Sequence, residues 1–373
     1  MTELSRRAFV RLGGAAAGAG ALAAAGTTGA AAAARGPAGV TAGTAGTAGT
    51  APAGGLPGRT RPFDLTAPAE PFLVNVGLHD QRTIMQSFAV DSPGGHVYVV
   101  QITQGGTVLP GDAPGDEEYA CRAARGDLTL SKLDLAGNLL GHMYLKRFGH
   151  GVAIGVERSG RDVHLWTEVD AVTEGASGWG TRLLRFPFAD GAVVDADVTP
   201  GLQRRELLPG VDRTTCNVDP VHRTLVMRYR RDGAFRFALF DLDQVRRDLP
   251  AYEPIADVAQ PDVLSGGPVF QGYATYGRDL YLFDGQIYSE TNPPEGQGNA
   301  HLTRVDWRTG SVEERVRTVD GHELHRREPE GLGVWLASPG RRPTARLGFA
   351  FGTSVTADPD DDRLCTILTK SLA

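Results

Sequence analysis

The sequence predicts an all-β fold, a single five-bladed β-propeller of four-stranded blades. The first observation is composition: 49 glycines and 23 prolines among 373 residues exceed average usage, and both residues weaken helices and favour turns between short strands. The second is a recurring unit in which an apolar strand, a tight polar turn and an alternating strand follow one another. The third is the repeat of this unit at intervals of about 60 residues, the length of a propeller blade.

Five of these units follow one another, and turns rich in glycine, proline, aspartate or serine join the two strands of each pair. The first turn is Ser-Pro-Gly-Gly, and the strand after it alternates β-branched and aromatic residues with others. The pairs are expected at residues 86–91 with 96–101, 150–157 with 163–168, 216–220 with 224–229, 271–277 with 279–283, and 328–337 with 347–351.

Further strand-like pieces between the pairs give each unit room for about four short strands. They lie at residues 128–135, 181–186, 235–242 and 302–305. The last unit has too few residues for a full blade, and residues 61–85 would supply the missing length. This predicts that an N-terminal strand closes the last blade. Two packed β-sandwiches are the structural alternative. Helix is expected only as one or two turns near residues 242–248.

The N-terminal part predicts export. Residues 1–34 contain Ser-Arg-Arg-Ala-Phe and then an apolar run of alanine and glycine, which resembles a twin-arginine (Tat) signal peptide of a protein exported folded. The run is too short and too rich in glycine to predict a membrane span. Residues 35–60, rich in Ala, Gly, Thr and Pro, predict a disordered linker, and residues 61–373 form the expected propeller.

Charge, cysteine content and missing motifs exclude several classes of protein. The formal net charge is −6 with both signs interspersed, which disfavours nucleic acid as a partner. Cys121, Cys216 and Cys365 do not have the spacing of a zinc site or a disulfide framework, so three thiols are expected, although one pair could bridge. No phosphate-binding loop, dinucleotide fingerprint or nucleophile elbow is present, and neither a cofactor nor a metal is predicted. The acidic run at 358–362 predicts a hairpin turn rather than a calcium loop.

Each unit has a polar residue near its start, and radial symmetry would bring these residues together around the propeller axis. Amide, imidazole and carboxylate groups can form hydrogen bonds with the hydroxyls of a sugar. The same groups could instead satisfy one another as a structural plug, and both interpretations stay open. The five residues are Gln86, His150, Asn217, Gln271 and Glu330.

His150 is the strongest single candidate because glycines on both sides allow its backbone to approach a ligand closely. Glu328 and Glu330 are candidate partners, since Pro329 favours an extended stretch that places both carboxylates on one side. Such a set suits acid–base catalysis or glycoside hydrolysis, although a histidine in a glycine-rich turn is often structural. Trp179, in a glycine-rich loop, is a candidate for stacking on a sugar or for core packing. Three acidic residues beside the second hairpin are expected to cap turns or face solvent: Glu157, Glu168 and Asp170.

Several stretches resemble a known family, and Met-Gln-Ser-Phe and Phe-Gly-His-Gly are the most specific. They lie at residues 84–91, 141–151, 155–157, 165–168 and 328–332. Over residues 72–370 the chain resembles the five-bladed propeller shared by phage receptor-binding (baseplate) proteins, helveticin-type bacteriocins and proteins called teichoic acid biosynthesis protein C. The resemblance implies recognition of bacterial cell-wall glycopolymers such as teichoic acids, without a settled enzymatic activity. The Tat signal and the lack of an extra tail-attachment or host-binding domain distinguish this sequence from phage and bacteriocin members.

We therefore expect a secreted or cell-wall-associated monomer that binds a cell-wall polysaccharide or teichoic acid at the central channel. A glycan-cleaving hydrolase or lyase at the channel mouth is the alternative, and a protein–protein interaction propeller is a third possibility. The candidate catalytic residues are His150, Glu328 and Glu330, and the candidate ligand-binding residues are Gln86, His150, Asn217, Gln271, Glu330 and Trp179.

Overall fold

The computed structural model describes residues 55–264, 269–337 and 344–373. The predicted signal peptide (1–34) and residues 35–54 of the predicted linker (35–60) lie outside the described residues. Leu56 and Thr60 already contact the folded part: Leu56 packs against a core cluster, and Thr60 lies against Gly277. The folded part therefore includes residues that lie before the predicted boundary at residue 61.

Five sheets form the five predicted blades, and the four strands of each blade are antiparallel. The sheet of blade 1 has a fifth strand, β11 (Val193–Asp195), which pairs parallel with the outermost strand of that blade. In each blade the first strand named is the innermost one. Blade 1 is β2 (Met85–Asp91), β3 (His96–Ile102), β4 (Leu128–Asp134) and β5 (Leu139–Lys146); blade 2 is β6 (Gly155–Ser159), β7 (Asp162–Val169), β10 (Arg182–Phe186) and β12 (Gln203–Arg205); blade 3 is β13 (Asp212–Asp219), β14 (Thr224–Arg231), β15 (Ala234–Asp241) and β16 (Ala256–Ala259); blade 4 is β17 (Val269–Tyr276), β18 (Asp279–Gly285), β19 (His301–Asp306) and β20 (Val312–Arg317); blade 5 is β21 (His325–Ala337), β22 (Thr344–Ser354), β23 (Leu364–Ser371) and β1 (Glu70–Gly77).

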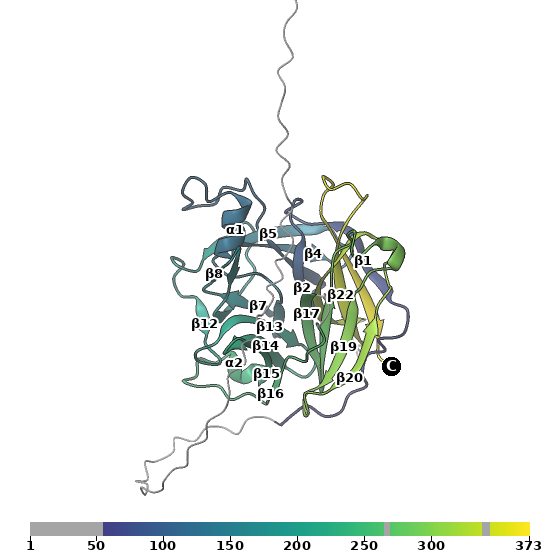
Figure 1. Ribbon diagram of the computed structural model, residues 1–373. Coiled ribbons are helices and arrows are strands. Elements are labelled where there is room, and N and C mark those ends of the chain that lie inside the picture. The colour runs from purple at the N-terminus through teal and green to yellow at the C-terminus, as the bar shows by residue number, and fades with distance from the viewer. Residues whose placement is uncertain (1–54, 265–268, 338–343) are drawn as a thin grey trace, which may run out of the picture. The chain divides into compact units, whose positions relative to one another are not determined.

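The innermost strands form a closed ring. Strand β2 neighbours β6, β6 neighbours β13, β13 neighbours β17, β17 neighbours β21, and β21 returns to β2. In Figure 1, β2, β13 and β17 lie towards the middle of the propeller, whereas β12, β16 and β20 lie at its rim. The all-β propeller with five four-stranded blades is thereby confirmed.

An N-terminal strand closes the last blade, as the sequence predicts. Strand β1 pairs antiparallel with β23, so the outermost strand of blade 5 comes from the opposite end of the chain. A bridge between Phe63 and Leu372 extends this pairing. Because the two ends of the chain share blade 5, backbone hydrogen bonds hold the last blade closed. Arrangement of the blades in a ring also leaves only short exposed strand edges.

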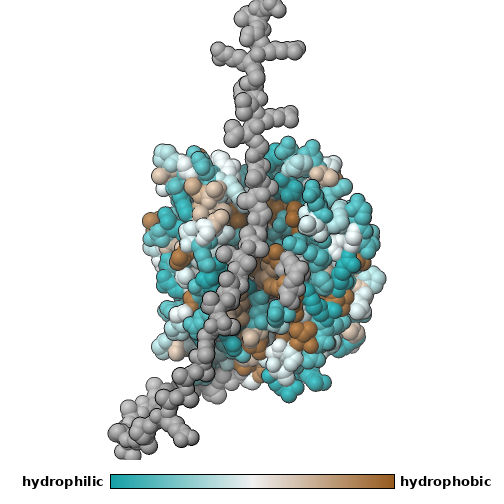
Figure 2. Space-filling model, viewed as in Figure 1, coloured by the Kyte–Doolittle hydropathy of each residue, from teal (hydrophilic) through white to brown (hydrophobic). Residues whose placement is uncertain are grey.

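The core consists of five apolar clusters, each between two neighbouring blades. Both faces of every sheet are therefore covered, which explains the runs of consecutive buried residues in the inner strands. On the surface visible in Figure 2, hydrophilic residues predominate and hydrophobic ones are scattered. Residues that represent the clusters are Val99 with Ile367 (blades 1 and 5), Leu130 with Leu165 (1 and 2), Trp166 with Met227 (2 and 3), Leu239 with Leu282 (3 and 4), and Phe283 with Phe349 (4 and 5).

A few local features differ from the prediction. The α-helix α1 (Tyr119–Arg125) and the 3-10 helix η1 (Pro294–Gly296) lie in long loops that carry no clear helical pattern, and the hairpin β8–β9 (Val172–Glu174, Ser177–Trp179) is a sixth, two-stranded sheet. The expected short helix is the single turn α2 (Leu242–Val245). Residues 150–154 are not strand. All three cysteines are free. Within the described residues, no helix is long and apolar enough to cross a membrane, and no group of three or more metal-ligating side chains is found.

Candidate functional site

All five inner strands begin at one end of the propeller, which we call the entry face. Because strands alternate in direction within a blade, the loops between the second and third strands also lie at this end. These loops are residues 103–127 with α1, 170–181 with β8–β9, 232–233, 286–300 with η1, and 355–363. The topology therefore brings the starts of the five inner strands, near which Gln86 and Gln271 lie, to one face.

Four of the five inner strands have a β-bulge at the entry face. The bulges lie at Gln86 in β2, between Asp212 and Thr215 in β13, at Gln271 in β17, and twice in β21. A bulge adds a residue to one strand of a pair and re-aims its side chain. The recurring bulge explains why polar residues interrupt otherwise apolar strands at equivalent positions.

Asn217 is buried where the inner strands converge. Its Nδ2 donates hydrogen bonds to the carbonyl oxygens of Ile154 (3.1 Å) and Leu332 (3.4 Å), so one amide connects three blades. Ser87 similarly donates from Oγ to the carbonyl oxygen of Gly151 at 2.5 Å. The contacts of Asn217 are those of a structural plug, although its Oδ1 has no hydrogen-bond partner among the described residues.

The backbones of three blades approach closely at this level of the axis. Gly331 has φ +76°, and a Cβ added there would lie 2.8 Å from the Cα of Ser87. A Cβ on Gly272 would lie 2.6 Å from the Cα of Gly331. These approaches pack β21 tightly against both of its neighbours in the ring, β2 and β17.

His150 lies in the segment before β6, and its imidazole stacks on the indole of Trp179 with ring centroids 4.6 Å apart. The loss of solvent around the ring, with the nearby charge of Arg213, lowers the pKa of His150 to about 4. The imidazole is therefore neutral at pH 7. Its Nδ1 has no hydrogen-bond partner among the described residues.

Hydrogen bonds to Glu168 fix the segment that carries His150 and the segment that follows Trp179. Its Oε1 accepts hydrogen bonds from the backbone N–H groups of His150 (3.0 Å) and Gly151 (2.7 Å), and Oε2 accepts one from Gly180 (2.7 Å). Burial raises the pKa of Glu168 to about 7 despite these three donors. The sequence suggests a turn cap or a solvent-facing residue here, but Glu168 is fully buried and joins the His150 segment to the Trp179 hairpin.

A row of alternating aromatic and guanidinium groups continues from Trp179 across blade 3. Arg213 lies 4.3 Å from the Trp179 ring centroid and 6.0 Å from that of Phe235. Arg228 lies 3.6 Å from the Phe235 centroid and 4.1 Å from that of Phe270. We call Trp179, Arg213, Phe235, Arg228 and Phe270 the cation–aromatic row.

Arg228 is the most unusual member of the row, because it is a buried cation that no carboxylate of the described residues contacts directly. It is 5% exposed and forms no ion pair within 4 Å, although the buried carboxylate of Glu168 is near enough to raise its pKa. Its Nε donates to Gln260 Oε1 at 2.8 Å, while its two terminal nitrogens donate to no described residue. Burial lowers the pKa of Arg228 to about 9, so it stays protonated at pH 7. Free guanidinium N–H groups between aromatic faces are suited to an anion.

Glu328 and Glu330 form a second cluster, on β21. Glu330 is 4% exposed, and its carboxylate accepts no hydrogen bond from the described residues. Burial and the charge of Glu328 raise the pKa of Glu330 well above its usual value, and burial raises that of Glu328 too. The Tyr119 phenol also lies near, since loss of solvent and both carboxylates raise its pKa. Arg326 and Arg327, just before, have φ 64° and 42°, a strained backbone for non-glycine residues.

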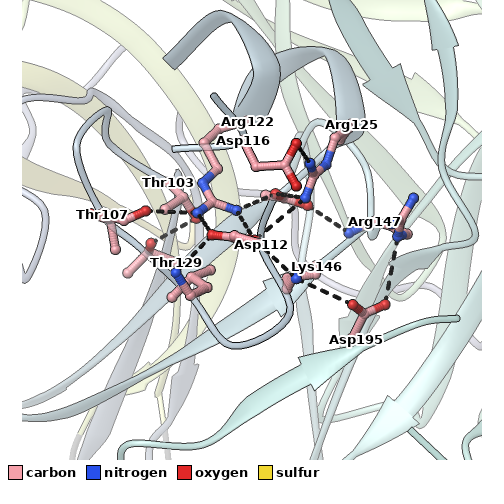
Figure 3. A network of polar contacts seen from close by, with 12 residues as sticks. Thr103, Thr107, Asp112, Asp116, Arg122, Arg125, Thr129, Lys146, Arg147 and Asp195 are labelled. Carbon is pink, nitrogen blue, oxygen red and sulfur yellow. Dashed lines mark hydrogen bonds and ion pairs between the residues drawn. The ribbon is translucent and has the colours of Figure 1, made fainter. Parts of the chain in front are cut away.

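The loop that carries Tyr119 is held by a buried ionic network, shown in Figure 3. Arg122 pairs with Asp112 and, at 2.8 Å, with Asp127. Lys146 Nζ lies 3.1 Å from Asp112 Oδ1. Burial opposes the charge of Asp112, but hydrogen bonds from Arg122, Lys146 and a backbone N–H hold its pKa well below the usual range. This network fixes α1 on blade 1 and so positions the loop at the entry face.

The structure brings some predicted residues together and separates others. His150 meets Trp179, and Glu328 lies beside Glu330, but the charged neighbour of His150 is Arg213 rather than either glutamate. The Gln86 amide donates only to the carbonyl oxygen of Met85, at 3.3 Å. The predicted turn at 358–362 lies in the loop between β22 and β23.

Sequence reasoning missed four residues of the row: Arg213, Phe235, Arg228 and Phe270. Only Arg228 leaves a signal in the sequence, as a charge within the apolar run Leu-Val-Met-Arg-Tyr. Such an interruption of a buried strand is rare unless the charge is paired or functional.

Comparison with known proteins gives the same fold. Residues 84–356 match a family described as phage 5-bladed beta propeller receptor binding platform domain. The putative major teichoic acid biosynthesis protein C of Bacillus subtilis (strain 168) is 25% identical over 281 residues, which are 73% of this chain and 57% of that protein. The solved tail fiber of Staphylococcus aureus phage P68 has 17% identity and a TM-score of 0.57, and the match covers 82% of this chain and 53% of that chain. The chain spans little more than half the length of these two proteins.

Proposed function

Because the chain belongs to the family of phage five-bladed β-propeller receptor-binding platform domains, we propose that it recognises a glycopolymer of the bacterial cell wall. The proposed site is the entry face, centred on His150 and the cation–aromatic row. The proposed ligand is anionic, of the teichoic acid type. The name of the Bacillus subtilis relative supports this ligand class, and the chemistry of the row supports it independently.

The observation that carries the proposal is Arg228. A buried guanidinium is costly to desolvate, and a fold normally balances it with a carboxylate. Here the two terminal nitrogens have neither an ion pair nor a hydrogen bond within the described residues, and two aromatic rings stack on the group instead. A phosphate of the polymer would supply the missing negative charge through paired N–H donors.

The rest of the row supplies contacts for the neutral part of such a polymer. Trp179 and Phe235 are half-buried, so a part of each ring is open to contact with a sugar or polyol. His150 is neutral and half-buried, and a neutral imidazole can form a hydrogen bond with a hydroxyl through a ring nitrogen that the ligand reaches. Arg213 is already paired with Glu174 at 2.9 Å, so Arg228 is the cation of the row that would hold a phosphate, and the rings beside it would contact the adjoining polyol or sugar.

Retention on isolated cell walls tests the proposal. The purified chain is incubated with walls of a Gram-positive bacterium, before and after chemical removal of their teichoic acids. We expect the protein to sediment with intact walls and to lose most of that retention on stripped walls. Equal retention on both would contradict an anionic glycopolymer as the ligand, and no retention on either would contradict wall binding.

A second candidate function rests on Glu328 and Glu330. A carboxyl group with a raised pKa beside a second carboxylate is the arrangement that glycoside hydrolysis uses for its general acid. We propose cleavage of a glycan as the alternative activity of the entry face. Release of reducing ends from wall polymers, lost in Glu330→Gln, would support it, whereas no release from any wall polymer would contradict it.

We also propose that the chain acts outside the cytoplasm. The Tat-like residues 1–34 would direct export of the folded propeller, and residues 35–60 would separate it from a surface. A reporter enzyme that needs folded export, fused behind residues 1–60, tests this. Replacing the Arg6–Arg7 pair by two lysines should retain the reporter inside the cell, and unchanged export would contradict the Tat route.

A further inference from the structure

A pocket lies at the end of the propeller opposite the entry face, between blades 1 and 2. Its volume is about 510 Å³. It borders the β2–β3 and β6–β7 turns, which join first and second strands and therefore lie at the far ends of the inner strands. The lining residues are His96, Tyr98, Lys132, Arg158, Arg161, Asp162, Val163, His164, Pro187 and Phe188.

Lys132 is the unusual cation of this pocket. It is half-buried on β4, directly opposite Tyr98 on β3. Its Nζ lies 5.4 Å from the ring centroid of Phe188 and 6.0 Å from that of Tyr98, and it forms no ion pair or hydrogen bond with the described residues. An ammonium group that rests on two aromatic rings without a counter-ion leaves its donors free for an anion.

The aromatic rings form an apolar floor next to this charge. Tyr98 and Phe188 have ring centroids 5.8 Å apart and planes 53° apart. Tyr98 is buried, and Phe188 packs against the core cluster between blades 1 and 2. The floor is therefore fixed by the core, and it can receive the carbon skeleton of a small ligand without rearrangement.

Two arginines add charge at the rim. Arg158 donates to both carboxylate oxygens of Asp91, at 2.9 and 2.6 Å, which fixes its guanidinium at the pocket wall. Arg161 is exposed and forms no ion pair with a described residue, whereas the carboxylate of Asp162 lies beside it. With Lys132, the pocket has an excess of positive charge although the whole chain is acidic.

Two imidazoles complete the lining. Burial and the nearby Lys132 lower the pKa of His96, and burial and Arg185 lower that of His164. Both rings are therefore mainly neutral at pH 7. Neutral imidazole both donates and accepts hydrogen bonds, which suits the hydroxyl groups of a polyol or a sugar.

We propose that this pocket binds a phosphate ester of a polyol or a sugar. The phosphate lies between Lys132 and Arg161, the carbon skeleton rests on Phe188, and hydroxyl groups face His96 and His164. The site is separate from the entry face, because the two lie at opposite ends of the inner strands. The inference therefore goes beyond the proposed function and does not depend on wall binding.

Chemical footprinting of Lys132 tests the proposal directly. The chain has three lysines, and the other two, Lys146 and Lys370, are 1% and 2% exposed, so acylation of the folded protein reports on Lys132. Acylation at Lys132 is followed by peptide mass spectrometry with glycerol 3-phosphate, inorganic phosphate, glycerol or sodium chloride at matched ionic strength. We expect about fivefold slower acylation with glycerol 3-phosphate, a smaller effect of inorganic phosphate, and none of glycerol or salt.

A second arm identifies the source of the phosphate. Purified teichoic acid is added in place of glycerol 3-phosphate at the same phosphate concentration. Protection by the small ester alone assigns the pocket to a free phosphate ester, and protection by the polymer as well assigns it to a polymer segment. Protection of Lys132 by neither ligand, or equal protection by sodium chloride, overturns the proposal.

Variants separate this pocket from general charge effects. By calorimetry we expect Lys132→Gln and Arg161→Gln each to weaken glycerol 3-phosphate binding about tenfold. Arg61→Gln, which removes an exposed cation outside the pocket, should leave the affinity unchanged. An equal loss in Arg61→Gln would overturn the site. Arg228→Gln serves as the check on the entry face: it should impair wall retention without changing protection of Lys132.

Discussion

The imidazole of His150 and the indole of Trp179 stack with their centroids 4.6 Å apart and their planes only 15° apart. One residue precedes the innermost strand of blade 2, and the other ends the hairpin inserted between the second and third strands of that blade. Glu168, on the strand between them, accepts backbone hydrogen bonds from both segments. This stack is the point from which the cation–aromatic row extends, and the predictions below test both.

Trp179→Ala should weaken retention on intact walls about tenfold, because the row loses a ring face and His150 loses its stacking partner. The quantity measured is the fraction of protein bound at a series of wall concentrations. Val172→Ala, an exposed position of the same hairpin at 60% exposure, is the matched control and should bind as the wild type does. Wild-type retention in Trp179→Ala would exclude Trp179 from the binding site.

Arg228→Gln should abolish most wall retention while leaving the fold intact. The free energy of unfolding should stay within about 1 kcal/mol of the wild type, since the change removes a buried cation that forms no direct ion pair with the described residues. Urea denaturation and wall binding are measured on the same preparation. Arg231→Gln, on the other face of the same strand, is the control and should retain binding. A large loss of stability in Arg228→Gln would indicate a structural role instead.

Stability should decrease from pH 5 to pH 8 because of Glu168. Its pKa is raised to about 7 in the folded chain, above its ordinary value, so the folded state holds a proton that the unfolded state has released. The contribution is therefore complete below about pH 4.5 and is lost as pH rises through 7, with roughly 3 kcal/mol as an upper bound. Urea denaturation between pH 5 and pH 8 measures it, and Glu168→Gln should flatten the slope.

Glu157→Gln is the matched control for this pH dependence. Glu157 is also buried on blade 2, but although burial opposes its charge, Arg185 and Trp166 donate hydrogen bonds that lower its pKa. Its pKa therefore stays below the measured range in both states, and the variant should lose stability by a similar amount at every pH. A slope flattened equally in both variants would refute the assignment to Glu168.

Gly149→Ala should destabilise the chain by about 2 to 4 kcal/mol and impair wall binding with it. A Cβ at this position would lie 1.9 Å from Glu168 Oε2, a group already fixed by three hydrogen bonds, so the His150 segment must move. Thermal or urea unfolding gives the magnitude. At Gly296 an added Cβ would meet nothing within 4 Å, and Gly296→Ala should change stability little. Similar losses in both variants would contradict this reasoning.

Glu330→Gln should raise the free energy of unfolding at pH 8 by about 1 kcal/mol and leave it unchanged at pH 5. Because the pKa of Glu330 is raised in the folded chain, folding at pH 8 has one of two unfavourable consequences. Either Glu330 must bind a proton, or its unpaired charge is buried beside Glu328. A neutral amide avoids both. Denaturation at the two pH values measures the difference. A loss of stability at pH 8 would indicate a favourable contact that the carboxylate makes in its ionised form.

Much of the fold could be predicted because it depends on short-range patterns. Glycine and proline mark the turns, alternation of residue types marks the strands, and five repeats of one length leave a ring as the arrangement that buries both faces of every sheet. The closing strand followed from the shortage of residues in the last unit. The helix α1 escaped prediction because buried ion pairs such as that of Arg122 with Asp127 hold it, not a pattern of apolar residues.

The candidate site, like the fold, could be predicted only in part. The repeat predicted one polar residue near the start of each unit, and the structure places them at different depths: Gln86 and Gln271 lie near the start of their inner strands, His150 precedes β6, and Asn217 lies deeper, towards the far end of β13. Their roles depend on neighbours that the repeat does not specify. Asn217 bonds to the backbones of two other blades, whereas His150 stacks on an inserted hairpin and Glu330 has a second carboxylate beside it.

The sequence by itself determined the class of fold, the number of blades and the closing strand, because each is a property of local pattern and of repeat length. Only the tertiary structure decided which side chains meet. Arg228 and Phe270 come from different blades, and Lys132 approaches Phe188 across the boundary between two blades. Burial, stacking and the absence of a counter-ion are properties of three-dimensional neighbourhoods, so no reading of spacing along the chain could have revealed them.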